Sequence, residues 1–192
     1  MYKEINQFLE RAVELLVLEE RKPHIYGVVE FCEKLARRYG LDNEKLKTMA
    51  LSHDLFRDVE GEKLKKIASL YGIELNEIVL KKPILLHGFV ASEYLKRRFG
   101  VNDYDVLLGV GYHTSGHPEF GVYGKALALA DSLEFTRVYD GVNKFRELAF
   151  YDMELAYREV IRNKIIYAVN FNLYVLPYTV ETWNKIVEEG KK

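Results

Sequence analysis

The chain has 192 residues, with 28 lysines and arginines against 29 aspartates and glutamates, and 48% of its residues are hydrophobic. This length is enough for one domain with a sizeable core, and the composition is that of a globular protein rather than a disordered or fibrous one. The net charge of -1 excludes a global electrostatic attraction to nucleic acid or to an anionic membrane.

The cysteine content and the first residues predict a cytoplasmic location. Cys32 is the only cysteine in the sequence, so no disulfide can form within the chain. Residues 1–16 carry too many charges for the apolar core of a signal peptide. No stretch approaches the roughly 18 uncharged apolar residues of a membrane-spanning helix. We therefore expect a cytoplasmic protein that binds neither membranes nor nucleic acid.

Apolar residues recur at helical spacing along the first part of the chain. Pro23 is suited to a first helical turn, and Gly40 and Gly72 are typical of helix ends. These signals predict helices over residues 2–20, 23–39, 42–56 and 61–72, followed by a short, poorly defined segment at 76–83.

The same periodicity continues after residue 83. It predicts helices over residues 84–99, 102–113, 125–137, 142–150, 152–174 and 180–190, with a loop containing glycine and proline at 114–124. No pair of strands, internal repeat or linker is evident in the sequence. We therefore expect an all-α, single-domain helical bundle.

Histidines and carboxylates interrupt the apolar faces of several predicted helices. The set consists of His24, His53, Asp54, His87, His113 and Asp131. For any single histidine, a neutral core residue is the simpler interpretation, because imidazole packs and forms hydrogen bonds well. A whole set of such residues favours one shared cluster instead, because isolated buried charges lose solvation at a high free-energy cost.

Metal binding is the chemistry that would bring these side chains together. Imidazole nitrogens and carboxylate oxygens suit iron, manganese, zinc and related divalent ions, whereas one cysteine cannot form a thiolate site. Asp54 is suited to bridge two ions. Two ions about 3.5 to 4 Å apart lower the pKa of a bound water and stabilise charge on phosphoryl oxygens. The cluster therefore predicts a phosphohydrolase.

The order of these residues resembles the HD-domain phosphohydrolase superfamily. The pair HD at residues 53–54 follows one histidine and precedes two more histidines and an aspartate. The segments LLHG, YHTSG and LALADSLEFTR are similar to the YqeK-type branch, the symmetrical bis(5'-nucleosyl)-tetraphosphatases. The resemblance implies one HD domain over residues 1–192, with a metal-site core at about 24–137 and C-terminal helices at about 142–189.

The resemblance also implies an activity and a ligand set. Such an enzyme is a metal-dependent hydrolase that cleaves diadenosine tetraphosphate in the middle to two ADP, with a metal-bridging hydroxide as the nucleophile. One metal would be held by His24, His53, Asp54 and Asp131, and the second by Asp54, His87 and His113. Iron is expected, with manganese, zinc, nickel and cobalt as alternatives. A homodimer is also expected.

Further residues are assigned to the substrate phosphates by the resemblance. Arg57, at a position where the family often has lysine, can bind phosphate oxygens in bidentate fashion and joins Asp54 as a catalytic residue. His117 is at an often basic position, with an exposed loop histidine as the alternative. Arg137 is expected near the phosphates, with a surface ion pair to Glu134 as the alternative.

Some questions of substrate and function stay open in the sequence. Asp58 could orient Arg57 or a histidine ligand, or it could be a solvated residue. Phe171, Tyr174 and Trp183 are expected in the core rather than in a base-stacking site. The alternative functions are a nucleotidase or nucleoside triphosphate hydrolase of the same superfamily, a non-catalytic nucleotide-sensing module, and a structural helical protein with buried neutral histidines.

Overall fold

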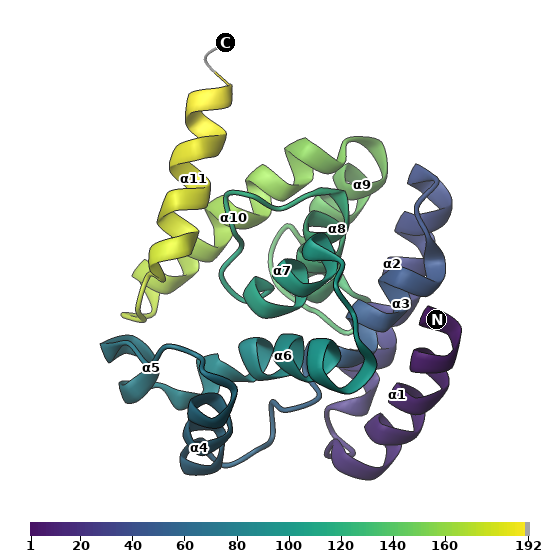
Figure 1. Cartoon of the computed structure of the whole chain (residues 1–192). Coiled ribbons are helices and arrows are strands. Elements are labelled where there is room, and N and C mark those ends of the chain that lie inside the picture. Colours follow the sequence, from purple (N-terminus) through teal and green to yellow (C-terminus); the bar gives the residue numbers. More distant parts are fainter. Residues whose placement is uncertain (191–192) are drawn as a thin grey trace.

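The structure is a computed structural model of the chain and describes residues 1–190. Every regular element within these residues is helical, which confirms the all-α prediction. The helices are α1 (Tyr2–Leu16), α2 (Lys22–Tyr39), α3 (Asn43–Ser52), α4 (Gly61–Tyr71), α5 (Glu77–Lys81), the 3-10 turn η1 (Pro83–Leu86), α6 (His87–Phe99), α7 (Tyr104–Tyr112), α8 (Val122–Leu133), α9 (Val142–Tyr151), α10 (Met153–Asn170) and α11 (Pro177–Glu189) (Figure 1).

Local sequence signals explain where several helices begin and end. Asp42 caps α3 by accepting a hydrogen bond from the backbone N–H of Lys45, and Asp103 caps α7 in the same way. Gly40 and Gly72 end α2 and α4 in the left-handed conformation, with φ of 66° and 73°. Glycine adopts this conformation without the steric cost of a Cβ.

Two helices in the N-terminal half are shorter than expected. The first ends at Leu16 rather than residue 20, because Val17 is extended, with φ of -93° and ψ of 138°. The third ends at Ser52 rather than residue 56. Beyond it, backbone hydrogen bonds span three residues instead of four, as from Leu55 N to Ser52 O. The HD pair therefore follows α3 instead of lying within it.

The C-terminal helices also differ from the expectation. The helix predicted to reach residue 174 ends at Asn170, and the chain turns at Asn172 with a positive φ of 53°. Phe171 and Tyr174 consequently leave the helix and are 62% and 48% exposed. The prediction that these two residues lie in the core was wrong. Trp183 does pack against a buried cluster on α10 and the loop before α8.

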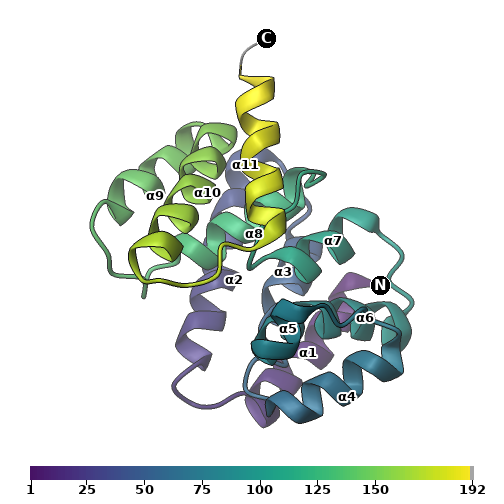
Figure 2. The same cartoon turned by 90° about the vertical axis from the view of Figure 1, so that its left-hand side faces the viewer.

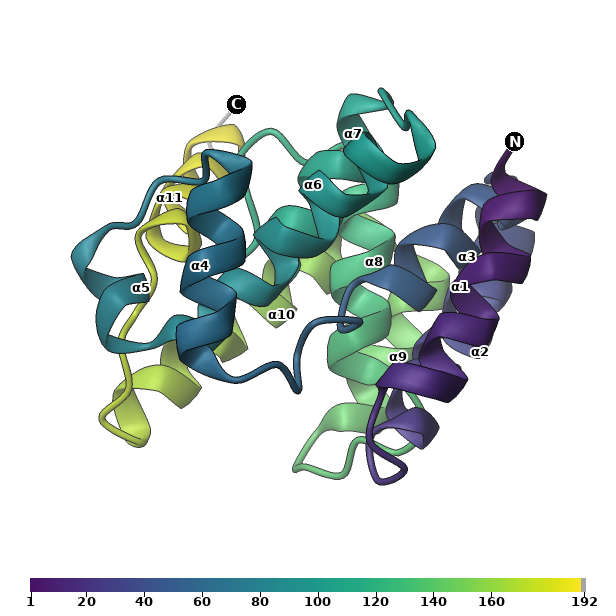
Figure 3. The same cartoon turned by 60° about the horizontal axis from the view of Figure 1, so that its bottom comes forward.

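The main hydrophobic core joins α1, α2 and α3 to α6, α7, α8, α9 and α10. Its elements pack in a continuous series in which α2 contacts both α3 and α8, and α7 contacts both α6 and α8 (Figures 1 and 2). A smaller cluster holds α4, α5 and η1 beside α6, on the side of the molecule away from α1 (Figure 3). Helix α8 therefore lies at the centre of the main core, with α2, α3, α7, α9 and α10 packed around it.

None of the helices within residues 1–190 combines the length and the apolar character needed to cross a bilayer.

A close approach of α6 to α7 depends on Gly88. A Cβ atom at this residue would lie 2.8 Å from the carbonyl oxygen of Gly111 and 2.9 Å from that of Val110. Both neighbours are backbone atoms, which cannot move without shifting α7. Gly88 therefore brings together the helices that carry His87 and His113.

We expect Gly88→Ala to lower the free energy of unfolding by about 1–3 kcal/mol, because the added methyl group overpacks the contact between α6 and α7. Gly111→Ala is the matched control, since its Cβ would lie 3.6 Å from the nearest side-chain atoms. An alanine in a helix interior is favoured over glycine by roughly 0.5–1 kcal/mol, so this variant should be no less stable than the native protein. Urea denaturation measures both, and equal stabilities for the two variants would contradict the packing argument.

Candidate metal centre

Five segments of the chain deliver the histidine and aspartate side chains to one place. His53 and His113 are the C-caps of α3 and α7, and His87 stands at the junction of η1 and α6. His24 lies in the first turn of α2, and Asp131 lies in α8. Asp54 follows His53 directly and is only 6% exposed. The structure therefore brings together all six residues that the sequence singles out.

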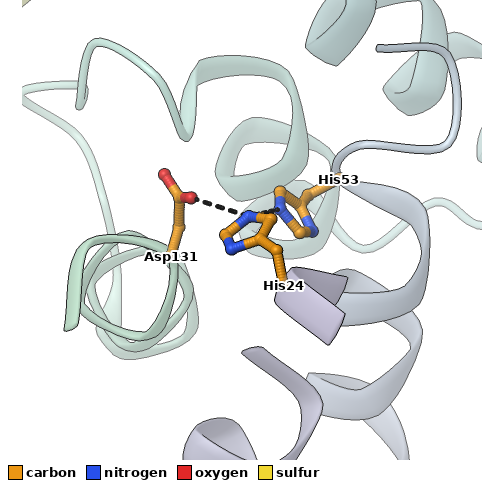
Figure 4. A group of neighbouring side chains, drawn as sticks. All are labelled: His24, His53 and Asp131. Carbon is orange, nitrogen blue, oxygen red and sulfur yellow. Dashed lines mark hydrogen bonds and ion pairs between the residues drawn. The ribbon is translucent and has the colours of Figure 1, made fainter. Parts of the chain in front are cut away.

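His24, His53 and Asp131 form one side of this cluster (Figure 4). The Nε2 atom of His24 lies 3.3 Å from Asp131 Oδ1 and 3.4 Å from His53 Nε2. Figure 4 shows the carboxylate and both rings turned toward one another. One atom from each residue lies within 4.8 Å of the other two, which is close enough for a shared metal ion.

His87 and His113 form the other side, and Asp54 lies between the two groups. Asp54 Oδ1 is 3.0 Å from His87 Nε2 and 3.7 Å from His113 Nε2. Its other oxygen, Oδ2, is 3.8 Å from the Nε2 atoms of both His24 and His53. The two oxygens of one carboxylate therefore face different groups of imidazoles.

Backbone carbonyl groups determine which nitrogen of each ring faces the cluster. The Nδ1 atoms of His53, His87 and His113 lie 2.7, 2.5 and 2.8 Å from the carbonyl oxygen three residues earlier. A carbonyl oxygen can only accept, so each Nδ1 carries the hydrogen and each Nε2 of a neutral ring has a free lone pair.

The donor set fits a cation. His87 Nε2 and His113 Nε2 face each other at 3.1 Å, although neither has a hydrogen to share when Nδ1 is the donor. Two lone pairs at this distance repel each other. A divalent ion between them would turn this repulsion into ligation, because neutral imidazole and carboxylate are ligands that such ions accept.

His24 is oriented by a carboxylate instead of a backbone carbonyl. Its Nδ1 donates to Glu134 Oε1 at 3.1 Å, and the Glu134 side chain is fully buried. Glu134 also accepts hydrogen bonds of 2.6 Å from the backbone N–H and the hydroxyl of Thr136. Gly27 makes room for it, since a Cβ atom there would overlap Glu134 Oε2. Glu134 thus belongs to the site, as a residue that holds a ligand in place.

Several buried ionisable groups of the cluster have shifted pKa values. Burial raises the pKa of Asp54, but the surrounding His53, His113 and His87 outweigh burial and hold this pKa below its usual range. Burial lowers the pKa of His53 to about 4 and also lowers that of His87. Both rings are consequently neutral at pH 7, the form in which imidazole binds metal.

The acidic partners of His24 raise the pKa of its ring. Burial lowers the pKa of His24, but hydrogen bonds to Asp131 and Glu134 overcome it and raise the pKa to about 9. Burial also raises the pKa of Asp131, yet the hydrogen bond from His24 and the charge of Lys164 hold it well below its usual range. Asp131 is therefore an anion at neutral pH and can serve as a ligand.

A cleft of about 1130 Å³ opens beside the cluster. His24 and Asp131 of the cluster line it, together with three cationic side chains, Arg21, Arg137 and Lys164. The other acidic residues of the lining are Glu20, Glu134 and Asp140. Four aromatic side chains, Tyr139, Tyr167, Phe171 and Tyr174, form an aromatic wall of the same cleft. Residues of the cluster, cations and aromatic rings thus line a single cavity.

Arg137 contacts both acidic partners of His24. Its Nη2 lies 3.0 Å from Asp131 Oδ1, and its Nε lies 3.5 Å from Glu134 Oε1. The sequence left two interpretations of Arg137, a place near the phosphates and a surface ion pair with Glu134. They are compatible, because the ion pair with Glu134 forms at the edge of the cluster rather than at a remote surface. The guanidinium is 44% exposed and can still reach a ligand in the cleft.

Sequence reasoning missed Arg21 and Lys164. The Nε of Arg21 lies 2.7 Å from Asp58 Oδ1, and its Nη1 lies 3.6 Å from Asp54 Oδ2. Asp58 therefore orients Arg21, not Arg57. Lys164 donates to the carbonyl oxygens of Thr114 at 2.9 Å and His113 at 3.3 Å. No local pattern distinguishes either residue from an ordinary surface cation, because only the packing of α2 and α10 around α8 brings them to the cleft.

Two predicted phosphate ligands lie elsewhere in the described part of the chain. Arg57 is half-buried and does not line the cleft. His117 lines a separate cavity of about 300 Å³, together with Phe120. Its ring packs against Tyr112 and Tyr178, with centroid distances of 4.7 and 4.8 Å. The structure does not bring Arg57 or His117 together with the three cations of the cleft.

Comparison with known proteins connects this geometry to a family. The family profile described as HD domain matches residues 21–136. Proteins named symmetrical bis(5'-nucleosyl)-tetraphosphatase from Bacillus subtilis and Halalkalibacterium halodurans are 32% and 30% identical to the chain. The two alignments cover 88% and 90% of the chain and 90% and 92% of those proteins.

A solved structure has the same fold as the chain. It is a crystal structure from Clostridium acetobutylicum, described as a predicted HD superfamily hydrolase involved in NAD metabolism. The TM-score is 0.88 and the sequence identity is 28%, with 98% of each chain covered. The similarity therefore includes the C-terminal helices, which lie beyond the residues matched by the family profile.

We expect Glu134→Gln to weaken metal binding by about 10- to 100-fold, because the amide no longer holds the His24 ring as the carboxylate does. Isothermal titration of the metal-stripped protein with Mn²⁺ measures the affinity. Glu119→Gln is the matched control, since Glu119 is an exposed carboxylate that accepts a hydrogen bond from Tyr104. Equal affinities for the two variants, both folded by circular dichroism, would show that Glu134 does not support the metal centre.

Proposed function

Because the chain belongs to the HD domain family, and within it to the group of proteins named symmetrical bis(5'-nucleosyl)-tetraphosphatase, we propose that it hydrolyses dinucleoside tetraphosphates at the central anhydride. Water would attack one of the two central phosphorus atoms, and the bridging oxygen would leave with the other half. Diadenosine tetraphosphate would then give two ADP. The observation that carries the proposal is the buried cluster of imidazoles and carboxylates beside a cleft that Arg21, Arg137 and Lys164 help to line.

The proposal includes two metal ions that share Asp54. His24, His53, Asp54 and Asp131 would hold one ion, and Asp54, His87 and His113 would hold the other. The different orientation of the two Asp54 oxygens supports this division. Bound there, such ions supply a water of lowered pKa and positive charge for the phosphoryl oxygens. Iron is the metal we favour, and manganese, zinc, nickel and cobalt accept the same donors.

The cationic side chains of the cleft would bind the polyphosphate. Arg21 is held by Asp58, and Arg137 is held by Asp131 and Glu134. A guanidinium in a fixed orientation can bind two phosphate oxygens at once. These contacts would place the central anhydride over the cluster. For Arg57 and His117, phosphate binding stays a prediction.

The other enzymatic function considered is hydrolysis of a nucleotide or nucleoside triphosphate. It is less favoured, because relatives aligned over about nine-tenths of both chains carry the name symmetrical tetraphosphatase. A sensing module without turnover is likewise less favoured, because all six ligand positions are filled and converge. The proposal also includes a cytoplasmic location, in agreement with the single buried and unpaired Cys32.

Product analysis tests the reaction directly. The protein is loaded anaerobically with Fe²⁺ and incubated with diadenosine tetraphosphate, and the nucleotides are separated by chromatography. We expect ADP as the only product. ATP together with AMP would show asymmetric cleavage and refute the proposal. Release of inorganic phosphate from ATP, without cleavage of the dinucleotide, would instead favour the triphosphate hydrolase.

We expect Asp54→Ala to lower turnover by at least about 10³-fold, because losing a shared metal ligand removes several kcal/mol of charge stabilisation. Metal analysis of the purified variant should also show reduced occupancy. Asp54→Asn keeps the size of the side chain and guards against a simple packing defect. Near-normal turnover in either folded variant would contradict the assignment of Asp54 as a bridging ligand.

A further inference from the structure

The cleft has an aromatic wall that the proposed chemistry does not use. Tyr167, Phe171 and Tyr174 line it, and their side chains are 54%, 62% and 48% exposed. They come from the end of α10 and the segment that leads to α11, outside residues 21–136. Exposed aromatic side chains that cluster beside an active cavity are typical of a ligand-binding surface.

The rings of Tyr167 and Phe171 form a pair. Phe171 is the C-cap of α10 and lies four residues after Tyr167, so the two side chains lie on the same side of the helix end. Their centroids are 4.5 Å apart, with an angle of 37° between the ring planes. Backbone hydrogen bonds from Phe171 N to Tyr167 O and from Leu173 N to Ala168 O hold the end of the helix in place. The pair is therefore positioned before any ligand binds.

Lys164 lies on the same helix as Tyr167, three residues earlier, and contacts the chain beside the metal cluster. Its ammonium donates to the carbonyl oxygens of His113 and Thr114, and its charge is felt by Asp131. Lys164 and Phe171 are seven residues apart, which corresponds to about 10 Å along a helix axis. One cation near the cluster and two rings farther out follow the order of phosphate, ribose and base in a nucleotide.

We propose that Tyr167 and Phe171 form a stacking site for one purine base of the substrate, and that Lys164 binds the phosphate next to that nucleoside. This inference rests on the proposed function and names the residues that would recognise the nucleoside. Every nucleobase has a flat π-face, and stacking on aromatic side chains is a common means of binding it. The HD core would then carry the reaction, and the C-terminal segment would select nucleotides among phosphoric anhydrides.

The contents of the cleft favour a nucleotide over a protein partner. The aromatic wall lines the same cavity as Arg21, Arg137 and Lys164 and as His24 and Asp131 of the metal cluster. A dinucleoside polyphosphate has the matching arrangement, with charged phosphates in the middle and an aromatic base at each end. The site accounts for one of its two bases.

Binding of ADP and pyrophosphate to the Mn²⁺-loaded protein separates base recognition from phosphate recognition. We expect Phe171→Ala to weaken ADP binding by about 10- to 100-fold, the range of one base stacked on aromatic side chains. Pyrophosphate binding should not change. Phe171→Trp should restore ADP binding, whereas Lys164→Met should weaken both ligands. Isothermal titration measures each affinity.

Tyr151→Ala is the matched control, because Tyr151 is 81% exposed on α9 and does not line the cleft. This variant should bind both ligands like the native protein. Equal losses of ADP and pyrophosphate binding in Phe171→Ala, or no loss of either, would overturn the stacking site. Sedimentation gives the oligomeric state of the same variants. A loss of dimer in Phe171→Ala with unchanged ADP affinity would identify the wall as a subunit interface and overturn the proposal.

The two proposals can fail separately. ADP binding does not depend on turnover, so the stacking site is tested even if diadenosine tetraphosphate is not cleaved. If the dinucleotide is cleaved symmetrically and Phe171→Ala leaves ADP binding unchanged, the proposed function stands and the stacking site is refuted.

Discussion

The buried carboxylate of Asp54 is the constraint on which the rest of the structure depends. An anion with so little solvent contact is costly unless positive charge or hydrogen-bond donors surround it. Four imidazoles from separate elements lie around its two oxygens. The arrangement of α2, α3, α6 and α7 can be understood as the means of bringing these rings to one carboxylate, while α8 adds a second carboxylate through Asp131.

Helix ends provide the orientation that this cluster needs. His53, His87 and His113 all occupy C-cap positions, next to the carbonyl groups of the last turn of a helix. Each Nδ1 donates to the carbonyl three residues earlier, and this hydrogen bond turns Nε2 toward the cluster. The same hydrogen bond occurs at the ends of α3, η1 and α7. His24 begins a helix instead, and the buried carboxylate of Glu134 replaces the missing carbonyl.

The cleft is lined by side chains from two regions of the chain. His24 and Asp131 belong to the region that matches the HD domain profile, whereas Lys164, Tyr167, Phe171 and Tyr174 come from α10 and the segment after it. The packing of α10 on α8 places these side chains beside Asp131. In the proposed stacking site, affinity for the base and reactivity at phosphorus would involve different side chains, so the C-terminal helices would determine the substrate preference.

Periodicity and residue type were sufficient to determine the helical class, most helix ends and the set of histidines and aspartates. Apolar spacing, capping residues and the conformational freedom of glycine act over a few residues, so these features can be identified without a fold. The position of the HD pair after α3, the roles of Glu134 and Asp58, and the arrival of Arg21 and Lys164 at the cleft could not be derived in this way. Each depends on contacts between residues distant in sequence, such as the 110 positions that separate His24 from Glu134. Only tertiary packing decides which cation or carboxylate among many lies next to a residue of the metal cluster. It also decides which aromatic side chains remain exposed in the cleft.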